Sequence, residues 1–542
     1  MAKGSGRWRA ADLLSTNRID KFSSAIQTVR MEESSRTTPY DELPYPSAVF
    51  SQTHPGSIGV VARLSGLTPA PVERCRVLEL GCGDGFNLLS MAYALPGSEF
   101  IGVDLATQPI ARGTAILEKL GLKNITLHAM DVADIGEDFG GFDYILAHGL
   151  FSWVPEHVRQ RILEICHRHL NAQGIVYISY NAYPGNHLRD LVRGMMRYHS
   201  AHFPRPADQI AQSRGLIKLL SQAGEKEDPY RQILERELDR IQKYTDAGFF
   251  HDDLSAVNQP FYFHEFTTQA AQNGLQFLGE AAVSEKQALT YPPPIQTVLD
   301  GLDPADVIGG EQYRDFLRCR AFRQTLLCHA GIAIDHQLDA RHFDGIYLAG
   351  EILPASGEWN VHSEKSELFL GANKSEFETN RPFLKAAFAR IAARWPQFIS
   401  TDELWLEIKH DLGETERATS QDLSSALLQI AIAGGLTLLT YRPPFLLEPT
   451  EKPTASALAR LEIETSNRVS TMRDDIVEIK DELARLLLRL LDGTRDRPAL
   501  LLTLQKTIDE GGVQTDPSFL TLSEADLERE LQKLARMALL VA

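Results

Sequence analysis

The stretch Val77-Leu-Glu-Leu-Gly-Cys-Gly-Asp-Gly85 decides the fold of this chain. A short apolar run ends in a turn that carries Gly81, Gly83 and Gly85, and a helical pattern begins at Phe86. Glycine permits positive φ angles and lets a ligand approach the backbone, and the first N–H groups of a helix are available to bind it. The stretch therefore predicts a cofactor-binding turn between a buried strand and a helix.

The glycine spacing narrows the class of cofactor. A dinucleotide-binding turn has the form G-x-G-x-x-G, but here the third glycine comes one residue early and the strand carries an acid, Glu79. No Gly-Lys-Ser/Thr follows, so the turn is not a phosphate-binding P-loop. The alternative to a cofactor site is a purely structural turn.

An alternation of apolar runs and helical patterns surrounds this turn. Runs of 4–6 residues separated by helices of 10–16 residues are typical of βαβ units and a parallel sheet buried on both faces. The predicted strands are 76–80, 99–103, 125–130, 142–147, 175–180, 275–279 and 321–328, with helices at 86–95, 109–120, 155–170 and 263–273. The predicted fold class is therefore a Rossmann-like α/β sheet with helical insertions.

Polar residues follow three of these strands. Asp104 ends the second strand, Asp131 ends the third, and His148 follows the fourth. Ligands of open α/β sheets bind at the carboxyl ends of the strands, and a carboxylate there can accept hydrogen bonds from both hydroxyls of a ribose. The alternative for each aspartate is an ordinary helix N-cap, and for His148 a hydrogen bond to loop backbone.

The turn E-x-G-x-G-x-G resembles motif I of class I S-adenosylmethionine-dependent methyltransferases. Further segments resemble bacterial methyltransferases with a methyltransferase regulatory domain, a group that includes the outer-membrane-protein lysine methyltransferases. These segments are Tyr40-Asp-Glu-Leu-Pro-Tyr45, His148-Gly-Leu-Phe-Ser-Trp-Val-Pro155, Ser179-Tyr-Asn-Ala-Tyr-Pro-Gly185 and Tyr262-Phe-His-Glu-Phe266. The resemblance covers roughly residues 40–334.

This resemblance implies a class I methyltransferase fold, S-adenosylmethionine as cofactor and protein lysine as acceptor. The cofactor contacts that it implies are Glu79, Gly81, Gly83, Gly85, Asp104, Leu105, Asp131, Val132 and His148. There are two alternative functions: methyl transfer to a small metabolite, and cofactor binding by a regulatory scaffold without catalysis.

Aromatic side chains near the predicted strand ends are the candidates for the acceptor site. Aromatic faces suit a cationic ammonium or sulfonium group. We expect Tyr45, Phe151, Trp153, Tyr180 and Tyr183 to converge over the cofactor, and His148 to accept a proton or orient the acceptor. For Tyr45 and Tyr183 the alternative is simple packing under a lid.

Composition separates the chain into regions. The predicted regions are a flexible arm at 1–36, a methyltransferase domain at 37–334 with a helical regulatory insertion at about 204–262, a connector at 335–366, a winged-helix-like module at 367–450 and a helical C-terminal domain at 451–542. Within the last region we predict a linker at 452–468 and helices at 474–491, 496–508 and 524–538.

Charge and cysteine content exclude several classes of protein. Asp and Glu outnumber Lys and Arg by 72 to 55, giving a net charge of −17, which disfavours nucleic-acid coating and polybasic membrane binding but suits a lysine-bearing partner.

The five cysteines form no C-x-x-C pair, which indicates reduced thiols in the cytoplasm. No uncharged apolar run reaches the ~18 residues that span a bilayer. Cys166, His167 and His169 do not share one helix face, so no metal site is predicted.

Overall fold

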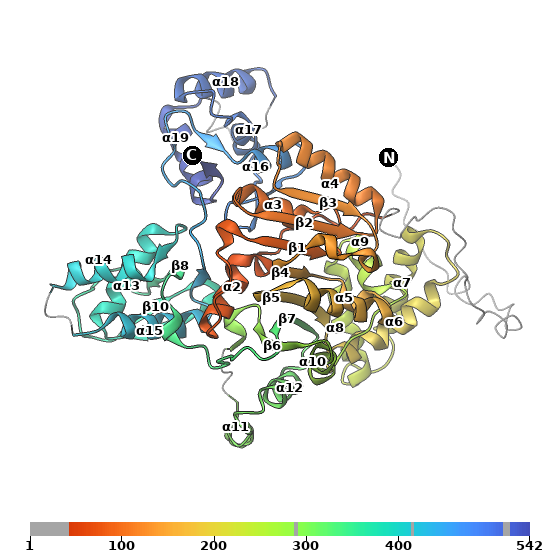
Figure 1. Cartoon of the computed structure of the whole chain (residues 1–542). Helices are drawn as coiled ribbons and strands as arrows, with labels where there is room; N and C mark the ends of the chain where they lie inside the picture. Colours follow the sequence, from red (N-terminus) through yellow and green to blue (C-terminus); the bar gives the residue numbers. More distant parts are fainter. Residues whose placement is uncertain (1–42, 287–290, 414–416, 513–520) are drawn as a thin grey trace, which may run out of the picture. The chain divides into compact units, whose positions relative to one another are not determined.

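The computed structural model describes residues 43–286, 291–413, 417–512 and 521–542 (Figure 1). The predicted arm at 1–36 lies outside these residues. No helix in the described ranges is both long and apolar enough to cross a membrane.

A seven-stranded sheet forms the centre of the N-terminal half (Figure 1). Its order is β3-β2-β1-β4-β5-β7-β6; β1 to β5 run parallel, and β7 is antiparallel to both of its neighbours. The strands are β1 (Arg76–Leu80), β2 (Glu99–Asp104), β3 (Ile125–Ala129), β4 (Phe142–Ala147), β5 (Leu170–Asn181), β6 (Leu275–Glu280) and β7 (Phe322–His329). This confirms the predicted Rossmann-like sheet.

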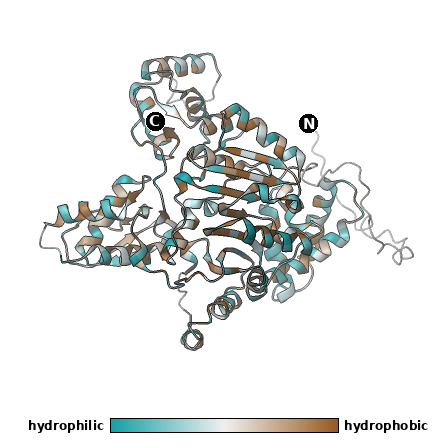
Figure 2. Ribbon diagram, viewed as in Figure 1, coloured by the Kyte–Doolittle hydropathy of each residue, from teal (hydrophilic) through white to brown (hydrophobic). Residues whose placement is uncertain are grey.

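Two layers of helices cover the sheet, because alternate residues of each strand face opposite sides. On β4, Tyr144 packs in one apolar cluster and Ile145 in the other. The first cluster includes side chains of α2 (Pro55–Leu64), α3 (Phe86–Ala94) and α4 (Thr107–Leu120). The second includes side chains of α5 (Glu156–His169) and α10 (Phe263–Gln272). The strands thus contribute apolar side chains to both clusters, and Figure 2 shows much of the sheet as brown, hydrophobic ribbon.

The predicted helical insertion has its own small core. Its helices are α7 (Pro206–Leu220), α8 (Pro229–Lys243) and α9 (Asp246–Asp253), and they pack with α6 (Asn186–Ser200). The shared apolar residues are Val192, Met196, Ile210, Ile217, Leu234, Ile241 and Phe249. The insertion is followed by α10 and, further along, by α11 (Pro293–Asp300) and α12 (Val307–Arg318).

The region after the sheet contains two further cores. The first is built from α13 (Pro382–Arg394), α14 (Thr401–Leu412) and α15 (Ser420–Ile432), with β8 (Tyr347–Ala349), β9 (Leu353–Pro354), β10 (Glu367–Leu370), β11 (Glu376–Thr379), β12 (Ile399–Ser400) and β13 (Thr437–Leu439). The second is built from α16 (Ala457–Glu462), α17 (Glu482–Leu490), α18 (Arg497–Asp509) and α19 (Glu524–Arg536), with β14 (Thr454–Ala455), β15 (Arg468–Ser470), β16 (Ile476–Glu478) and β17 (Leu540–Val541).

The predicted helix at 474–491 is wrong over its first eight residues, 474–481. Asp474 has a φ of 60°, so the chain turns there and β15 pairs with β16 as a hairpin. The helix starts only at Glu482, where the Asp481 side chain caps it by accepting a hydrogen bond from the Ala484 N–H. The predicted linker at 452–468 likewise contains β14 and α16.

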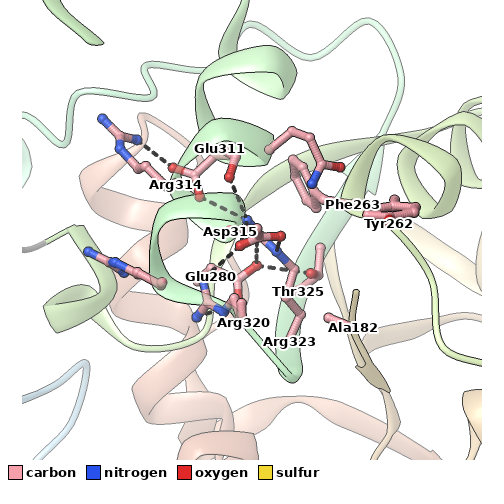
Figure 3. Close-up of polar contacts among 12 residues, drawn as sticks. Ala182, Tyr262, Phe263, Glu280, Glu311, Arg314, Asp315, Arg320, Arg323 and Thr325 are labelled. Atoms are coloured by element: carbon pink, nitrogen blue, oxygen red, sulfur yellow. Dashed lines mark hydrogen bonds and ion pairs between the residues drawn. The ribbon is translucent and has the colours of Figure 1, made fainter. Parts of the chain in front are cut away.

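A buried ion cluster joins α12 to the antiparallel end of the sheet (Figure 3). The Arg323 side chain on β7 is fully buried; its Nε and Nη2 each lie 2.8 Å from a carboxylate oxygen of Asp315, and its Nη1 lies 2.6 Å from Glu280 Oε1. Glu311 Oε2 is 3.2 Å from Nη2, and the guanidinium lies 3.8 Å from the ring centroid of Phe263. Since buried charges are tolerated only when paired, these contacts fix the position of α12.

We predict that Arg323→Met lowers the free energy of unfolding by about 3–5 kcal/mol, because it leaves buried carboxylates without their cation. Urea unfolding followed by circular dichroism measures the change. Arg205→Met is the matched control, since Arg205 pairs with Asp208 at the surface, and it should leave the midpoint almost unchanged. Equal midpoints for the two variants would contradict a stabilising role for the cluster.

Candidate functional site

The glycine turn has the conformation that its sequence requires. The φ angles of Gly81, Gly83 and Gly85 are 73°, 60° and 72°, values that disfavour residues with a Cβ. A Cβ at Gly85 would lie 2.5 Å from Leu127 Cδ2, whereas a Cβ at Gly83 would have no atom within 4 Å. The turn is therefore packed against the sheet at Gly85 and open at Gly83, the side on which a ligand can approach.

Asp104 holds this turn from the neighbouring strand. Its Oδ2 accepts a hydrogen bond from the Gly83 N–H at 2.8 Å, and its Oδ1 accepts one from the Ala106 N–H at 2.8 Å. Leu105 beside it is 44% exposed. These bonds place the Asp104 carboxylate beside Gly83, and its contact with ribose hydroxyls remains a prediction.

Asp131 and Val132 follow β3, as the sequence predicts. The Asp131 carboxylate accepts a hydrogen bond from the Ala133 N–H at 2.9 Å, and Val132 is buried. Asp131 therefore acts as the cap of a 3₁₀ turn, Val132–Asp134, which was the alternative considered for it. A contact of Asp131 with an adenine remains a prediction.

Glu79 lies under the glycine turn and is buried. Its Oε1 accepts a hydrogen bond from Asn87 Nδ2 at 2.9 Å, but its Oε2 is buried with no hydrogen-bond partner among the described residues. Burial raises the pKa of Glu79 to about 8. A buried carboxyl group beside an open turn fits a cationic cofactor such as S-adenosylmethionine, whose positive charge favours the ionised form.

Asn87 was not predicted, although it joins three parts of the site. Besides Glu79, its Nδ2 donates to Thr53 Oγ1 at 3.0 Å, and its Oδ1 accepts from the Phe50 N–H at 3.0 Å. Ser47 Oγ adds a hydrogen bond to Asp84 Oδ2 in the glycine turn. These contacts lay the segment 47–53 against the turn. They pair residues more than 30 positions apart, so no local pattern in the sequence indicates them.

His148 follows β4 and faces β5. Its Nδ1 lies 3.0 Å from the Tyr177 hydroxyl and 3.3 Å from Ser179 Oγ, and its ring centroid is 4.0 Å from that of Phe50. Burial lowers the pKa of His148 to about 4, so the imidazole is neutral near pH 7, a weak base that can orient an acceptor by a hydrogen bond. Tyr177 and Ser179 were not predicted as partners of His148, although their i, i+2 spacing indicates that both lie on one side of β5.

Tyr180, predicted to be catalytic, is not brought to the site. Strand alternation directs it to the opposite side from Tyr177 and Ser179. It is 1% exposed, its ring stacks on Phe266 at 4.1 Å, and its hydroxyl lies 3.2 Å from Thr325 Oγ1. Tyr180 is therefore a core residue that no substrate can contact. Phe151 is likewise a core residue, fully buried against Phe261 and Phe266.

The other predicted aromatic residues lie around the carboxyl edge of the sheet. The Tyr45 hydroxyl is 3.4 Å from Asp252 Oδ2 on α9. Trp153 ends a 3₁₀ turn after β4 and is half-buried. Tyr183 follows β5, donates a hydrogen bond to Asp190 Oδ2 at 3.0 Å and stacks on His187 at 4.0 Å, and burial raises its pKa to about 12. Their roles toward an acceptor remain predictions.

Three protein-family models match the chain. Residues 77–174 match the family described as "Methyltransferase domain", residues 245–329 match "Predicted methyltransferase regulatory domain", and residues 451–540 match "PKMT, C-terminal winged helix domain". The winged-helix family model matches the region that the sequence predicts as a helical C-terminal domain, 451–542. It does not match 367–450, where a winged-helix-like module is predicted. The regulatory model begins near the end of the predicted insertion at about 204–262 and extends through β7.

Two relatives match nearly the whole chain. An uncharacterized protein of Rickettsia prowazekii (strain Madrid E) is 31% identical over 533 residues, which cover 96% of this chain and 93% of that protein. The structure of PKMT2 from Rickettsia typhi is similar with a TM-score of 0.80 and 29% identity, covering 92% of this chain and 100% of that chain. PKMT2 in complex with AdoHcy gives the same values.

We predict that Glu79→Gln flattens the pH dependence of stability between about pH 4.5 and 8. In this range the folded chain holds a proton on Glu79 that the unfolded chain has lost, so the free energy of unfolding of the parent falls as pH rises. Burial raises the pKa of Asp474 to about 7. Asp474 therefore adds the same pH dependence to the free energy of unfolding of the parent and of the variant, and it does not affect the difference between their slopes.

Urea unfolding at several pH values measures this slope. Glu137→Gln is the control, because the Glu137 side chain is 87% exposed, and it should keep the slope of the parent. A Glu79→Gln slope equal to that of the parent would show that Glu79 titrates normally.

Proposed function

This chain belongs to the S-adenosylmethionine-dependent methyltransferases that carry a regulatory domain, and on this premise we propose that it methylates lysine side chains of proteins in the cytoplasm. The observation that carries the proposed acceptor is the extent of the likeness to PKMT2, a protein lysine methyltransferase. The likeness covers all of that chain, including the winged-helix domain, and so goes far beyond the part that binds the cofactor. The five cysteines form no disulfide, which supports the proposed compartment.

The residues at the carboxyl edge supply what methyl transfer to an amine requires. When bound, S-adenosylmethionine supplies an electrophilic methyl group. Gly83 and Asp104 would hold this cofactor. The acceptor must be a neutral amine, because an ammonium has no lone pair. The ammonium gives its proton to water as the lysine enters the site, and His148, whose imidazole is neutral near pH 7, orients the amine. The Phe50 ring against the imidazole limits the access of water to it.

A lysine side chain also suits the residues around this edge. The rings of Tyr183 and Phe50 and the carboxylates of Asp190 and Asp252 lie on the segments that surround it. Aromatic faces and carboxylates both favour a cation as it approaches, while the interior next to His148 favours the neutral amine.

We predict that the protein transfers tritiated methyl groups from S-adenosylmethionine to lysines in a bacterial lysate, with the label in hydrolysed protein as methyl-lysine. Asp104→Asn should abolish labelling, since its amide has one acceptor oxygen and an NH₂ group where the carboxylate accepts from the N–H groups of both Gly83 and Ala106. Asp134→Asn, at an exposed position after β3, is the matched control and should label as the parent does.

The location of the label separates the proposed function from its alternatives. Label found only in small molecules would replace the lysine acceptor by a metabolite. S-adenosylhomocysteine binding in a calorimeter without any transfer would indicate a scaffold that binds the cofactor and does not catalyse.

We predict that His148→Gln lowers the rate at saturating acceptor by about 100-fold at pH 7, because the imidazole that orients the acceptor amine is lost. The rate of the variant should rise with pH up to about 10, as water removes more of the lysine protons, and its affinity for S-adenosylhomocysteine should stay within about threefold of the parent. His157→Gln, on the exposed side of α5, serves as control. Full activity of His148→Gln at pH 7 would exclude a role of His148 in orienting the acceptor.

A further inference from the structure

Helix α12 buries polar side chains and exposes large apolar ones. Its buried face is polar and consists of Glu311, Gln312 and Asp315. Its outward face carries three large apolar side chains beside Arg314, which pairs with Glu311: Tyr313 and Phe316 are each 47% exposed, and Leu317 is 38% exposed. A surface helix of a globular protein normally shows the reverse arrangement, with apolar residues inside. An exposed apolar group of this size marks an interaction surface more often than chance exposure.

The buried ion cluster holds α12 in this orientation (Figure 3). Asp315 and Glu311 both contact the guanidinium of Arg323, and Gln312 Oε1 accepts a hydrogen bond from the His264 backbone N–H at 3.1 Å. Rotating the helix to bury Phe316 would remove these partners from Arg323, which is 0% exposed. The apolar face is therefore fixed outward by the fold itself.

Ring contacts connect this face to the catalytic edge of the sheet. The ring centroid of Phe316 is 6.1 Å from that of Tyr262, and Tyr262 is 5.3 Å from Tyr183. Tyr183 in turn stacks on His187 at 4.0 Å. Tyr183 lies two residues past the end of β5, which runs parallel to β4, so it is at the same edge as His148. The rings thus extend from α12 toward the carboxyl edge of the sheet, the edge at which His148 lies.

We propose that these residues form an acceptor-docking surface, which binds a segment of the acceptor protein beside the target lysine. The surface consists of Tyr183, His187, Tyr262, Tyr313, Phe316 and Leu317. The segment that fits it carries apolar and basic side chains together. This inference rests on the proposed function and adds to it a docking site in the regulatory region.

Charge argues for a basic partner. Aromatic faces attract lysine and arginine, and Asp190 beside Tyr183 and the exposed Glu265 beside Tyr262 add negative charge to the docking surface. The net charge of −17 opposes a second copy of this chain as the occupant, because like charges repel on association. An apolar and basic segment satisfies both the rings and the carboxylates.

Binding of two fluorescent peptides to the full chain, loaded with S-adenosylhomocysteine, tests the docking surface. Each peptide has one central lysine; one has Phe, Leu and Arg around it, and the other Ser and Asp. By fluorescence anisotropy we expect the first peptide to bind at least about tenfold more tightly than the second. The triple variant Tyr313→Ser, Phe316→Ser, Leu317→Ser should lose this preference.

The control is the double variant Leu406→Ser, Leu502→Ser, because these leucines are 68% and 73% exposed on α14 and α18, outside the docking surface. It should bind both peptides as the parent does. Circular dichroism melting of all three proteins checks that each variant is folded; if the triple variant unfolds, Phe316→Gln alone replaces it in the same assay.

Equal affinity of the parent for the two peptides, or an unchanged preference in the triple variant, would overturn the docking surface. Methyl transfer to the peptides is measured separately. If the apolar and basic peptide binds and loses affinity in the triple variant, but no methyl transfer occurs, the docking surface stands and the proposed function fails. A parent that is a dimer in sedimentation, with a monomeric triple variant and unchanged peptide binding, would assign the surface to a second copy instead.

Discussion

The carboxylate of Asp104 is the interaction on which the site depends. It binds the N–H of Gly83 in the turn after β1 and the N–H of Ala106 in the turn after β2, so one side chain sets the positions of both turns. The two strands are neighbours in the sheet, with Leu80 opposite Val103, which leaves Asp104 beside the glycine turn. The positive φ angles that glycine permits are thus stabilised by an ionic hydrogen bond as well as by packing.

Two polar anchors then organise the rest of the catalytic edge. Asn87 attaches the segment around Phe50 to the glycine turn, and that segment brings the Phe50 ring against His148. Arg323 attaches α12 to the antiparallel end of the sheet and turns its apolar side outward. The first anchor lies at the proposed cofactor site and the second holds the proposed docking surface, so separate buried polar groups position the two.

The parts of this structure that the sequence predicts are those set by local chemistry. The glycine turn, the strand that precedes it and the acid at the end of β2 each follow from residues within a few positions of one another. Arg323 and Glu280 are 43 positions apart, and Asn87 and Thr53 are 34 apart, so their contacts depend on the tertiary fold and leave no periodic pattern. Tyr180 was misplaced although strand alternation could have excluded it, because Tyr177 and Ser179 define the side of β5 that faces His148.

A crystal structure of the chain with S-adenosylhomocysteine tests the central claim most directly. The account predicts both ribose hydroxyls within hydrogen-bond distance of the Asp104 carboxylate and the thioether sulfur facing His148 across the carboxyl ends of β1 and β4. A ligand that occupies this edge without contacting Asp104, or that binds elsewhere on the chain, would contradict the site described for this methyltransferase.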